Sequence, residues 1–348
     1  MSERTALVIG GTGQIGVATA LALAEAGWRV TVAHRGRQSV PPELDVETVQ
    51  LDREDGAALA AASAGTDLLV DTVAFTPAHA AQLQTLDVGR LVVVSSAAVY
   101  AGANGSYLEV ATDEASFPDY PVPIPEDWTL VDNDEQTYSP LKAAMERVLL
   151  AGRVPVSILR AGAIHGPHSP ALREWYYIKR ALDERPQVVL AHDGAGRFHP
   201  AGTRNLAALV LACAATPGTH VLNAVDEECP SDADIARTVY AALDREVEVV
   251  TFPGPPRESV GASPWAIPKP FVLSMERAHR EVGYVAPLTY AQGVEEDIAW
   301  VRSRFAETGA SSELWQDALP GLWGSEGRGW FDYAAEDTFL AGRSAASG

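Results

Sequence analysis

A tyrosine and a lysine have the side chains and the spacing that proton transfer requires. Tyr138 and Lys142 form the pattern Tyr-x-x-x-Lys, and residues at positions i and i+4 share one face of a helix. The ordinary pKa of tyrosine is near 10, and a neighbouring ammonium group favours the phenolate and lowers that pKa. Tyr138 could then exchange a proton with a carbonyl or alcohol oxygen, to which Ser96 could also hydrogen-bond. We therefore predict that Ser96, Tyr138 and Lys142 form a catalytic set.

A glycine-rich turn near the N-terminus has the composition of a phosphate-binding loop. Its glycines follow the apolar run Ala6 to Ile9 and open a stretch with helical spacing. Glycines let the backbone approach an anion, and the first turn of a helix offers free N–H groups and a partial positive charge. A strand before the glycines and a helix after them is the context of dinucleotide sites. The predicted cofactor contacts are Gly10, Gly13, Gln14, Ile15 and Gly16, with Lys142 on the nicotinamide ribose.

The end of the second expected strand indicates which dinucleotide binds. An NAD site usually places an acid there to accept hydrogen bonds from the adenosine ribose. This sequence has Arg35 and Arg37 instead, and guanidinium groups pair well with phosphate oxygens. We therefore predict NADP(H) in preference to NAD(H), with Arg35 on the 2′-phosphate; the alternative for Arg35 is a solvated surface charge. Asp52 could hydrogen-bond the adenine amino group or could cap the following helix.

The elements that must position these residues follow from the apolar pattern. Between residues 5 and 100, short apolar runs typical of buried parallel strands alternate with Ala- and Leu-rich stretches of helical spacing. This alternation predicts an α/β fold with a doubly wound parallel sheet, which binds ligands at the carboxyl ends of its strands. Helices are expected at residues 15–26, 56–64, 138–150, 172–182, 205–215, 232–243 and 290–305.

The pattern loosens after the sixth strand, which predicts a smaller, mostly helical second lobe. We expect a dinucleotide-binding domain from residues 1–165 plus about 201–225, and a substrate lobe from about 166–200 and 226–310. The Pro-rich stretch 101–136 interrupts the alternation and is too long for a simple connection. The 311–348 tail is rich in aromatic residues, so it should pack on its own domain or form a subunit contact or pocket wall.

Composition excludes several classes of function. The 348-residue chain has 46 acidic and 26 basic residues, a net charge of −20, which disfavours nucleic-acid and anionic-membrane partners. Two cysteines cannot form a disulfide framework, and no apolar run reaches the roughly 20 residues that cross a bilayer. The N-terminus leaves no room for a secretion signal before the first strand, so a cytoplasmic protein is expected. A homodimer is possible, since two-fold dimers are the commonest soluble oligomers.

Four segments together resemble one known family. They are the Gly10/Gly13/Gly16 turn, the run Ser95 to Tyr100, the Tyr138/Lys142 pair, and the run Arg160 to Pro167. Over about residues 5–305 the chain resembles the extended short-chain dehydrogenases/reductases, the NAD-dependent epimerase/dehydratase superfamily. The resemblance implies a Rossmann-type sheet with a C-terminal substrate lobe. It also implies Ser96, Tyr138 and Lys142 as the catalytic triad, with hydride moving to or from a nicotinamide.

Two departures from the family pattern restrict the chemistry. Ala97 and Ala98 stand where the sugar-nucleotide dehydratases carry the Asp-Glu pair that drives elimination, so dehydration is not expected. The run ending in Arg197 resembles a segment whose arginine contacts a nucleotide-sugar diphosphate. However, Arg204-Asn205 replaces the Asp usually found after it, which weakens that interpretation. Arg197 is either an anion contact or a solvated charge, and the tentative substrate contacts are Ala98, His165 and Arg197.

The predicted function is hydride transfer on a small molecule. The chain is expected to be an NADP-dependent enzyme that reduces a carbonyl or oxidises a secondary alcohol, with Tyr138 as proton donor or acceptor. The first alternative is an epimerase that forms a transient keto intermediate with the same triad. The second, from another class, is a non-catalytic NADP-binding sensor or scaffold. The eight histidines have no metal-ligand spacing, so no metal is expected, and His165 is more often a polar loop residue than a ligand.

Overall fold

A computed structural model describes residues 4–36, 39–324 and 329–347, so Arg37 lies outside the described residues. The chain forms two compact units. Unit 1 contains residues 1–164, 201–227 and 273–288, and unit 2 contains residues 165–200, 228–272 and 289–348. Two short strands, β7 (Ala163–His165) and β9 (Pro200–Gly202), lie where the chain passes from one unit to the other.

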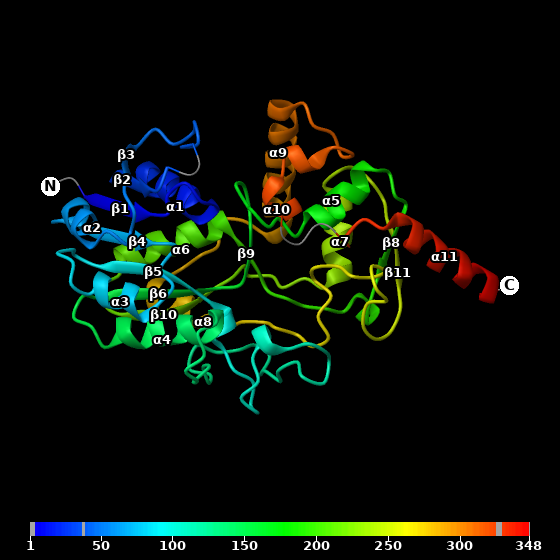
Figure 1. Ribbon diagram of the computed structural model, residues 1–348, viewed down its shortest axis with the longest axis horizontal. Helices are drawn as coiled ribbons and strands as arrows, with labels where there is room; N and C mark the ends of the chain where they lie inside the picture. Colours follow the sequence, from blue (N-terminus) through cyan, green and yellow to red (C-terminus); the bar gives the residue numbers. More distant parts are fainter. Residues whose placement is uncertain (1–3, 37–38, 325–328, 348) are drawn as a thin grey trace. The chain divides into compact units, whose positions relative to one another are not determined.

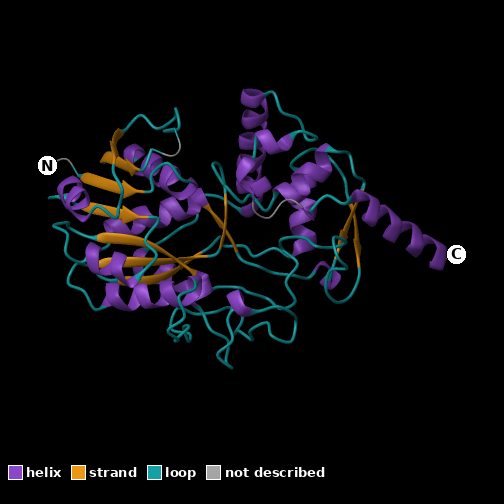
Figure 2. Ribbon diagram, in the orientation of Figure 1, coloured by secondary structure: helices purple, strands orange, loops and turns teal. Residues whose placement is uncertain are grey.

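Unit 1 is built on a seven-stranded parallel sheet, seen as the block of arrows on the left of Figures 1 and 2. Its strand order is β10-β6-β5-β4-β1-β2-β3. The chain runs outward from β1 in one direction and from β4 in the other, so the topological switch point lies between these two strands. The bounds are β1 Thr5–Ile9, β2 Arg29–His34, β3 Glu47–Gln50, β4 Leu68–Asp71, β5 Leu91–Ser96, β6 Val156–Ala161 and β10 His220–Ala224.

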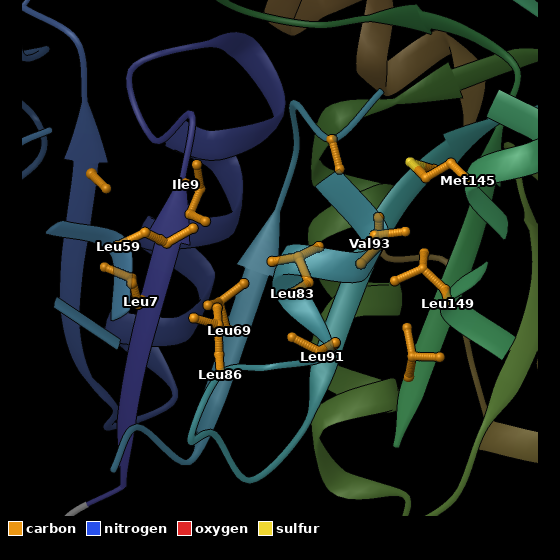
Figure 3. Close-up of a cluster of buried hydrophobic side chains, with 14 of the residues drawn as sticks. Leu7, Ile9, Leu59, Leu69, Leu83, Leu86, Leu91, Val93, Met145 and Leu149 are labelled. Atoms are coloured by element: carbon orange, nitrogen blue, oxygen red, sulfur yellow. The ribbon is translucent and has the colours of Figure 1, made fainter. Parts of the chain in front are cut away.

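Helices cover both faces of this sheet and bury its apolar side chains. On one face, α1 (Gln14–Glu25) packs against α6 (Thr203–Ala215). On the other face, α2 (Gly56–Ser63), α3 (Pro77–Leu83) and α4 (Tyr138–Leu150) bring Leu59, Leu83 and Leu149 onto Leu69 and Val93 of the strands. Figure 3 shows these side chains between sheet and helices. The sheet and these helices, together with α8 (Glu276–Val282), make the doubly wound α/β fold that the apolar alternation predicts.

The long connection between β5 and α4 is anchored to unit 1. It begins with the short helix η1 (Ala97–Val99) and includes η2 (Leu108–Val110). Tyr107 and Val131 pack in a small core with Val99 and Ala143. The indole N–H of Trp128 donates to the carbonyl of Ala101 at 2.8 Å. The segment therefore returns to the helix that carries Tyr138 rather than leading away from the unit.

Unit 2 is mostly helical. Its helices are α5 (Trp175–Leu182), α7 (Asp232–Ala241), α9 (Tyr290–Thr308), α10 (Pro320–Gly324) and α11 (Tyr333–Ser347), with short turns η3 (His192–Gly194) and η4 (Trp315–Asp317). Two parallel strands, β8 (Gln187–Leu190) and β11 (Glu248–Thr251), pair beside them. Among the described residues, no helix combines the length and the apolar character that a membrane span needs.

The aromatic C-terminal segment packs on unit 2 itself. The rings of Trp315 and Trp175 lie 5.7 Å apart, and those of Trp330 and Tyr176 lie 5.9 Å apart. The guanidinium of Arg180, which is fully buried, forms an ion pair with Glu336 of α11. The packing of the tail on its own domain, the first of the two expected arrangements, is therefore observed for these residues.

Candidate active site

The glycine turn lies at the carboxyl end of β1, where it opens α1. Gly10 has φ +77°, and a Cβ there would lie 2.5 Å from Oγ1 of Thr72. A Cβ on Gly16 would lie 2.3 Å from the carbonyl oxygen of Gly10, so both positions require glycine. A Cβ on Gly13 would contact only the carbonyl oxygen of Gly10, at 3.4 Å. Gly13 is the N-cap of α1, and it has no side chain to accept the N–H groups of the first turn. The turn therefore presents unshielded backbone donors of Gln14 and Ile15, which is what an anion requires.

A pocket of about 440 Å³ lies beside this turn, at the carboxyl ends of β1, β2, β3 and β4. Four of the predicted cofactor residues line it: Gly10, Gly13, Arg35 and Asp52. Arg35 is exposed, at the end of β2.

The N-cap of α2 is Asp55, whose carboxylate accepts the N–H of Ala58, so the alternative role of Asp52 as that cap is wrong. Asp52 instead accepts the N–H of Glu54 at 3.1 Å, within the pocket wall.

The same pocket contains charged residues that the sequence analysis missed. Arg53 is buried and donates from Nη2 to Asp71 at 2.9 Å. Its Nε and Nη1 have no hydrogen-bond partner among the described residues, so this guanidinium keeps donors available for an acceptor. The Asp52-Arg53 pair directly after the third strand was the available signal.

His79 and Glu54, which also line the pocket, form a pair. His79 accepts the N–H of Phe75 at Nδ1, so Nε2 carries the hydrogen that points at Glu54, 2.8 Å away. Burial, with the charge of Arg53, lowers the pKa of His79, which favours this neutral tautomer at neutral pH. Glu54 and Asp52 make the pocket mixed in charge rather than purely cationic.

The predicted catalytic residues lie on two elements, β5 and α4, that pack against each other. Ser96 ends β5, and its Oγ accepts the N–H of Ala98 at 3.1 Å. Tyr138 begins α4, is 43% exposed, and lies with its ring 5.6 Å from that of Phe75. Helix α4 packs against β5 and η1. The predicted helix bounds, residues 138–150, agree with the observed ones.

Lys142 links α4 to the carboxyl ends of β4 and β5. Its ammonium donates to the carbonyls of Ala74 at 2.7 Å and Val94 at 3.0 Å. Burial is the main reason that the pKa of Lys142 is lowered to about 8; the charges of Asp71 and Glu146 oppose this shift, and the charge of Arg53 adds to it. The lysine is thus a buried cation placed at the sheet edge that also carries the glycine turn.

Glu109, from the long connection, caps the first turn of α4. Its carboxylate accepts the N–H groups of Tyr138 at 2.9 Å and Ser139 at 2.8 Å, whereas the N-cap residue Thr137 makes no side-chain cap. Burial of Glu109 opposes ionisation, but these backbone hydrogen bonds outweigh it and lower the pKa. Glu109 lies 29 residues before Tyr138, so no local capping pattern could reveal it.

Behind the strand end lies a buried charge network. Arg160 of β6 donates to Glu146 of α4 at 2.8 Å and to the hydroxyl of Tyr100 at 3.0 Å. Glu146 in turn accepts the hydroxyl of Ser95 at 2.5 Å. The network fixes α4 against β5 and β6, one residue away from Ser96. It therefore supports the geometry of the predicted catalytic residues from the side of the core.

Comparison with known proteins agrees with this arrangement. The family model described as "NAD dependent epimerase/dehydratase family" matches residues 6–223. The chain belongs to that family. Comparison with curated protein sequences gives no match. The family match confirms the resemblance seen in the sequence, and the parallel sheet is the Rossmann-type sheet it implies.

Solved structures share the fold at low identity. A Bacillus cereus UDP-glucuronic acid 4-epimerase bound to UDP-4-deoxy-4-fluoro-glucuronic acid and NAD has a TM-score of 0.63 and 16% identity, covering 86% of this chain and 99% of its own. A Bacillus anthracis dTDP-glucose 4,6-dehydratase with NAD has the same TM-score and identity, covering 87% and 98%. A Bacillus cereus UDP-N-acetylglucosamine 4-epimerase has a TM-score of 0.63 and 14% identity, covering 86% and 97%.

The tentative substrate residues fall in different places within this family fold. Ala98 lies half-buried in η1, in unit 1. Arg197 is exposed in unit 2, and its Nε donates to the carbonyl of Cys229 at 3.0 Å. His165 is not an accessible loop residue. It is buried in unit 2, where its Nδ1 lies 3.1 Å from Asp297.

Proposed function

We propose that this family member is an NADP-dependent oxidoreductase that interconverts a carbonyl and a secondary alcohol on a small molecule. The observation that carries the proposal is the position of Lys142. It is a buried cation one helical turn from Tyr138, bonded to the strand ends beside the glycine turn and the 440 Å³ pocket. A dinucleotide on that turn would supply or accept the hydride. The chain's own residues would position the oxygen and move the proton.

The proton in this proposal moves through Tyr138. In the direction of reduction, the Tyr138 hydroxyl donates its proton to the substrate oxygen while Ser96 donates a second hydrogen bond to that oxygen. In the direction of oxidation, Tyr138 takes the proton back. Lys142, one helical turn further along α4, would donate to the cofactor ribose. Tyr138 is 43% exposed, as expected of a residue that contacts a substrate.

The proposed preference for NADP rests on Arg35. The exposed guanidinium lines the pocket at the end of β2, where an NAD-specific site usually carries an acid. Arg53, with donors that no described residue accepts, lines the same pocket and adds positive charge. The solved structures cited above that hold a cofactor are complexes with NAD, so the preference is a property proposed for this chain alone.

The second candidate is an epimerase, favoured by the 4-epimerases among the similar solved structures. It would use the same Tyr138 proton transfer but return the hydride to the other face of a keto intermediate. A dehydratase is not proposed, because positions 97 and 98 are alanines and lack the acid that elimination needs.

One assay separates these candidates. The purified chain is mixed with NADPH and a panel of ketones and nucleotide sugars, and the loss of NADPH absorbance is followed alongside product analysis by mass spectrometry. A reductase consumes NADPH in proportion to the product. An epimerase forms an isomer with no net consumption. The proposal would be contradicted if no member of the panel gave either NADPH consumption or an isomer. Formation of a 4-keto-6-deoxy sugar would contradict the exclusion of dehydration.

A further inference from the structure

Unit 2 contains a buried cluster of three metal-ligand side chains that the proposed chemistry does not use. His165, Glu174 and Asp297 are all buried, and one ligand atom from each lies within 4.8 Å of the others. Nδ1 of His165 is 3.1 Å from Oδ2 of Asp297. We propose that this cluster is a binding site for a divalent first-row transition-metal ion such as Zn²⁺.

The carboxylate oxygens support an ion rather than a closed hydrogen-bond network. Oε2 of Glu174 and Oδ1 of Asp297 are buried and have no hydrogen-bond partner among the described residues. An unpaired buried acceptor is costly, and two carboxylates next to one imidazole carry more negative charge than the imidazole can neutralise. A divalent cation would satisfy both oxygens and the charge at once.

The surroundings of the cluster are shaped for these ligands. On α9, Tyr290, Gly293 and Asp297 are spaced by three and four residues and so share one face. A Cβ on Gly293 would lie 2.6 Å from Cε1 of His165, so only glycine leaves room for the imidazole. The Tyr290 hydroxyl donates to Oε1 of Glu174 at 3.1 Å, which orients that carboxylate from outside the cluster.

The donor set indicates the class of ion. One imidazole nitrogen and two carboxylate oxygens are ligands that Zn²⁺, Mn²⁺ and Fe²⁺ accept, whereas Ca²⁺ and Mg²⁺ prefer oxygen ligands alone. The ion would replace the hydrogen bond between His165 and Asp297, so His165 must bind it as the neutral ring. It would tie the segment 165–174 to α9, two parts of unit 2 that are distant along the chain.

The test measures metal content and does not depend on any activity. The full chain is produced in zinc-supplemented medium, purified without chelators and desalted, and its zinc is counted by plasma mass spectrometry. We expect about one zinc ion per chain in the wild type. Asp297→Asn and Glu174→Gln should retain less than about a tenth of it, since loss of one ligand removes most of the affinity. Folded wild-type protein that carries no zinc would overturn the proposal, as would equal zinc in the variants.

Two matched controls and one measurement without variants keep the test decisive. Asp232→Asn and His199→Gln change buried residues of the same unit outside the cluster and should retain the zinc. If the ligand variants do not fold, wild-type chain produced with Co²⁺ in place of Zn²⁺ should show the visible absorption of a protein-bound cobalt ion, and Zn²⁺ should remove it. Folded protein from cobalt-supplemented medium that shows neither this absorption nor bound cobalt by plasma mass spectrometry would overturn the proposal.

Discussion

The buried ion pairs of the two units join parts of the chain with very different separations. In unit 1, Arg53 pairs with Asp71 over 18 residues, and Arg160 pairs with Glu146 over 14. In unit 2, His165 pairs with Asp297 over 132 residues. Arg180 pairs with Glu336 over 156. The pairs in unit 1 lie within one or two strand–helix steps, so the local fold brings them together. The two pairs in unit 2 form only once distant segments of that unit have come together, so no local sequence pattern predicts them.

The largest effect should come from removing the hydroxyl of Tyr138. If unit 1 carries the chemistry, Tyr138→Phe should lower turnover by about 10²- to 10⁴-fold, the usual contribution of a positioned acid or base. Cofactor affinity, measured by fluorescence titration, should change little because the ring remains. Tyr107→Phe, which removes a hydroxyl bonded to Glu135 in the same unit, is the matched control and should keep its activity. Near-normal turnover of Tyr138→Phe would assign the proton to another group.

Breaking the long-range pair of unit 2 should cost about 3–5 kcal/mol of unfolding free energy. Arg180→Met leaves Glu336 charged and buried, and it removes the hydrogen bonds of Arg180 to the carbonyls of Tyr176 and Trp330. Urea unfolding followed by tryptophan fluorescence measures the loss.

The double variant Arg180→Met, Glu336→Leu should recover part of that loss, because no unpaired charge remains buried. An unfolding free energy of Arg180→Met equal to that of the wild type would contradict the assignment of the C-terminal helix to the core of unit 2.

Cofactor discrimination should respond to Arg35. Arg35→Ala should weaken NADPH binding by roughly 10- to 150-fold, the value of a charged hydrogen bond, and NADH binding much less. Isothermal titration with both cofactors measures the ratio, and Arg245→Ala, an exposed arginine of unit 2, is the control. Equal affinity of the wild type for NADH and NADPH would contradict the proposed contact between Arg35 and the 2′-phosphate.

The pH dependence of cofactor binding should report Lys142. Burial lowers its pKa to about 8, so the ammonium is present below that pH and is lost as the pH rises through it. Affinity should then fall by up to about tenfold per pH unit above 8, and Lys142→Met should weaken binding and abolish this dependence. Because the unfolded chain still holds that proton up to its ordinary pKa of 10.5, the lysine should also make stability rise with pH between about 8 and 10.5. A dependence that persists in Lys142→Met would contradict this.

The smallest effect should come from the cap on α4. Glu109→Ala removes the acceptor for two N–H groups and should cost about 1 kcal/mol of stability, measured by thermal unfolding. The pKa of Glu109 is lower in the folded chain than its ordinary value. The stabilisation is therefore fully present at pH values above the ordinary pKa, and it is lost as the pH falls through the lowered pKa of the folded chain. Asp113→Ala, in the same connection but bonded to Ser116 instead, should not affect α4. Identical losses in the two variants would refute the capping role.

Much of unit 1 was predictable because its signals are local. The strand-glycine-helix order placed the turn correctly, and the apolar spacing gave the bounds of α4. Helix α3 was overlooked, although Thr76 and Pro77 are a cap and a first-turn residue of the usual types. Arg53 and Glu109 were missed for a different reason. For Glu109, nothing in the immediate sequence distinguishes a capping residue from a surface charge. For Arg53, the one signal was its place beside Asp52 after the third strand, which does not by itself distinguish a pocket residue from a surface charge.

The sequence by itself determined the parallel sheet, the glycine turn and the spacing of Tyr138 and Lys142, because apolar periodicity and glycine stereochemistry act over a few residues. Only the tertiary structure decided which charges became buried and what they faced. His165 was expected as a polar loop residue without metal spacing, yet it lies against Asp297 in the interior. A buried charge must find its partner wherever the fold provides one, and that partner can be more than a hundred residues away.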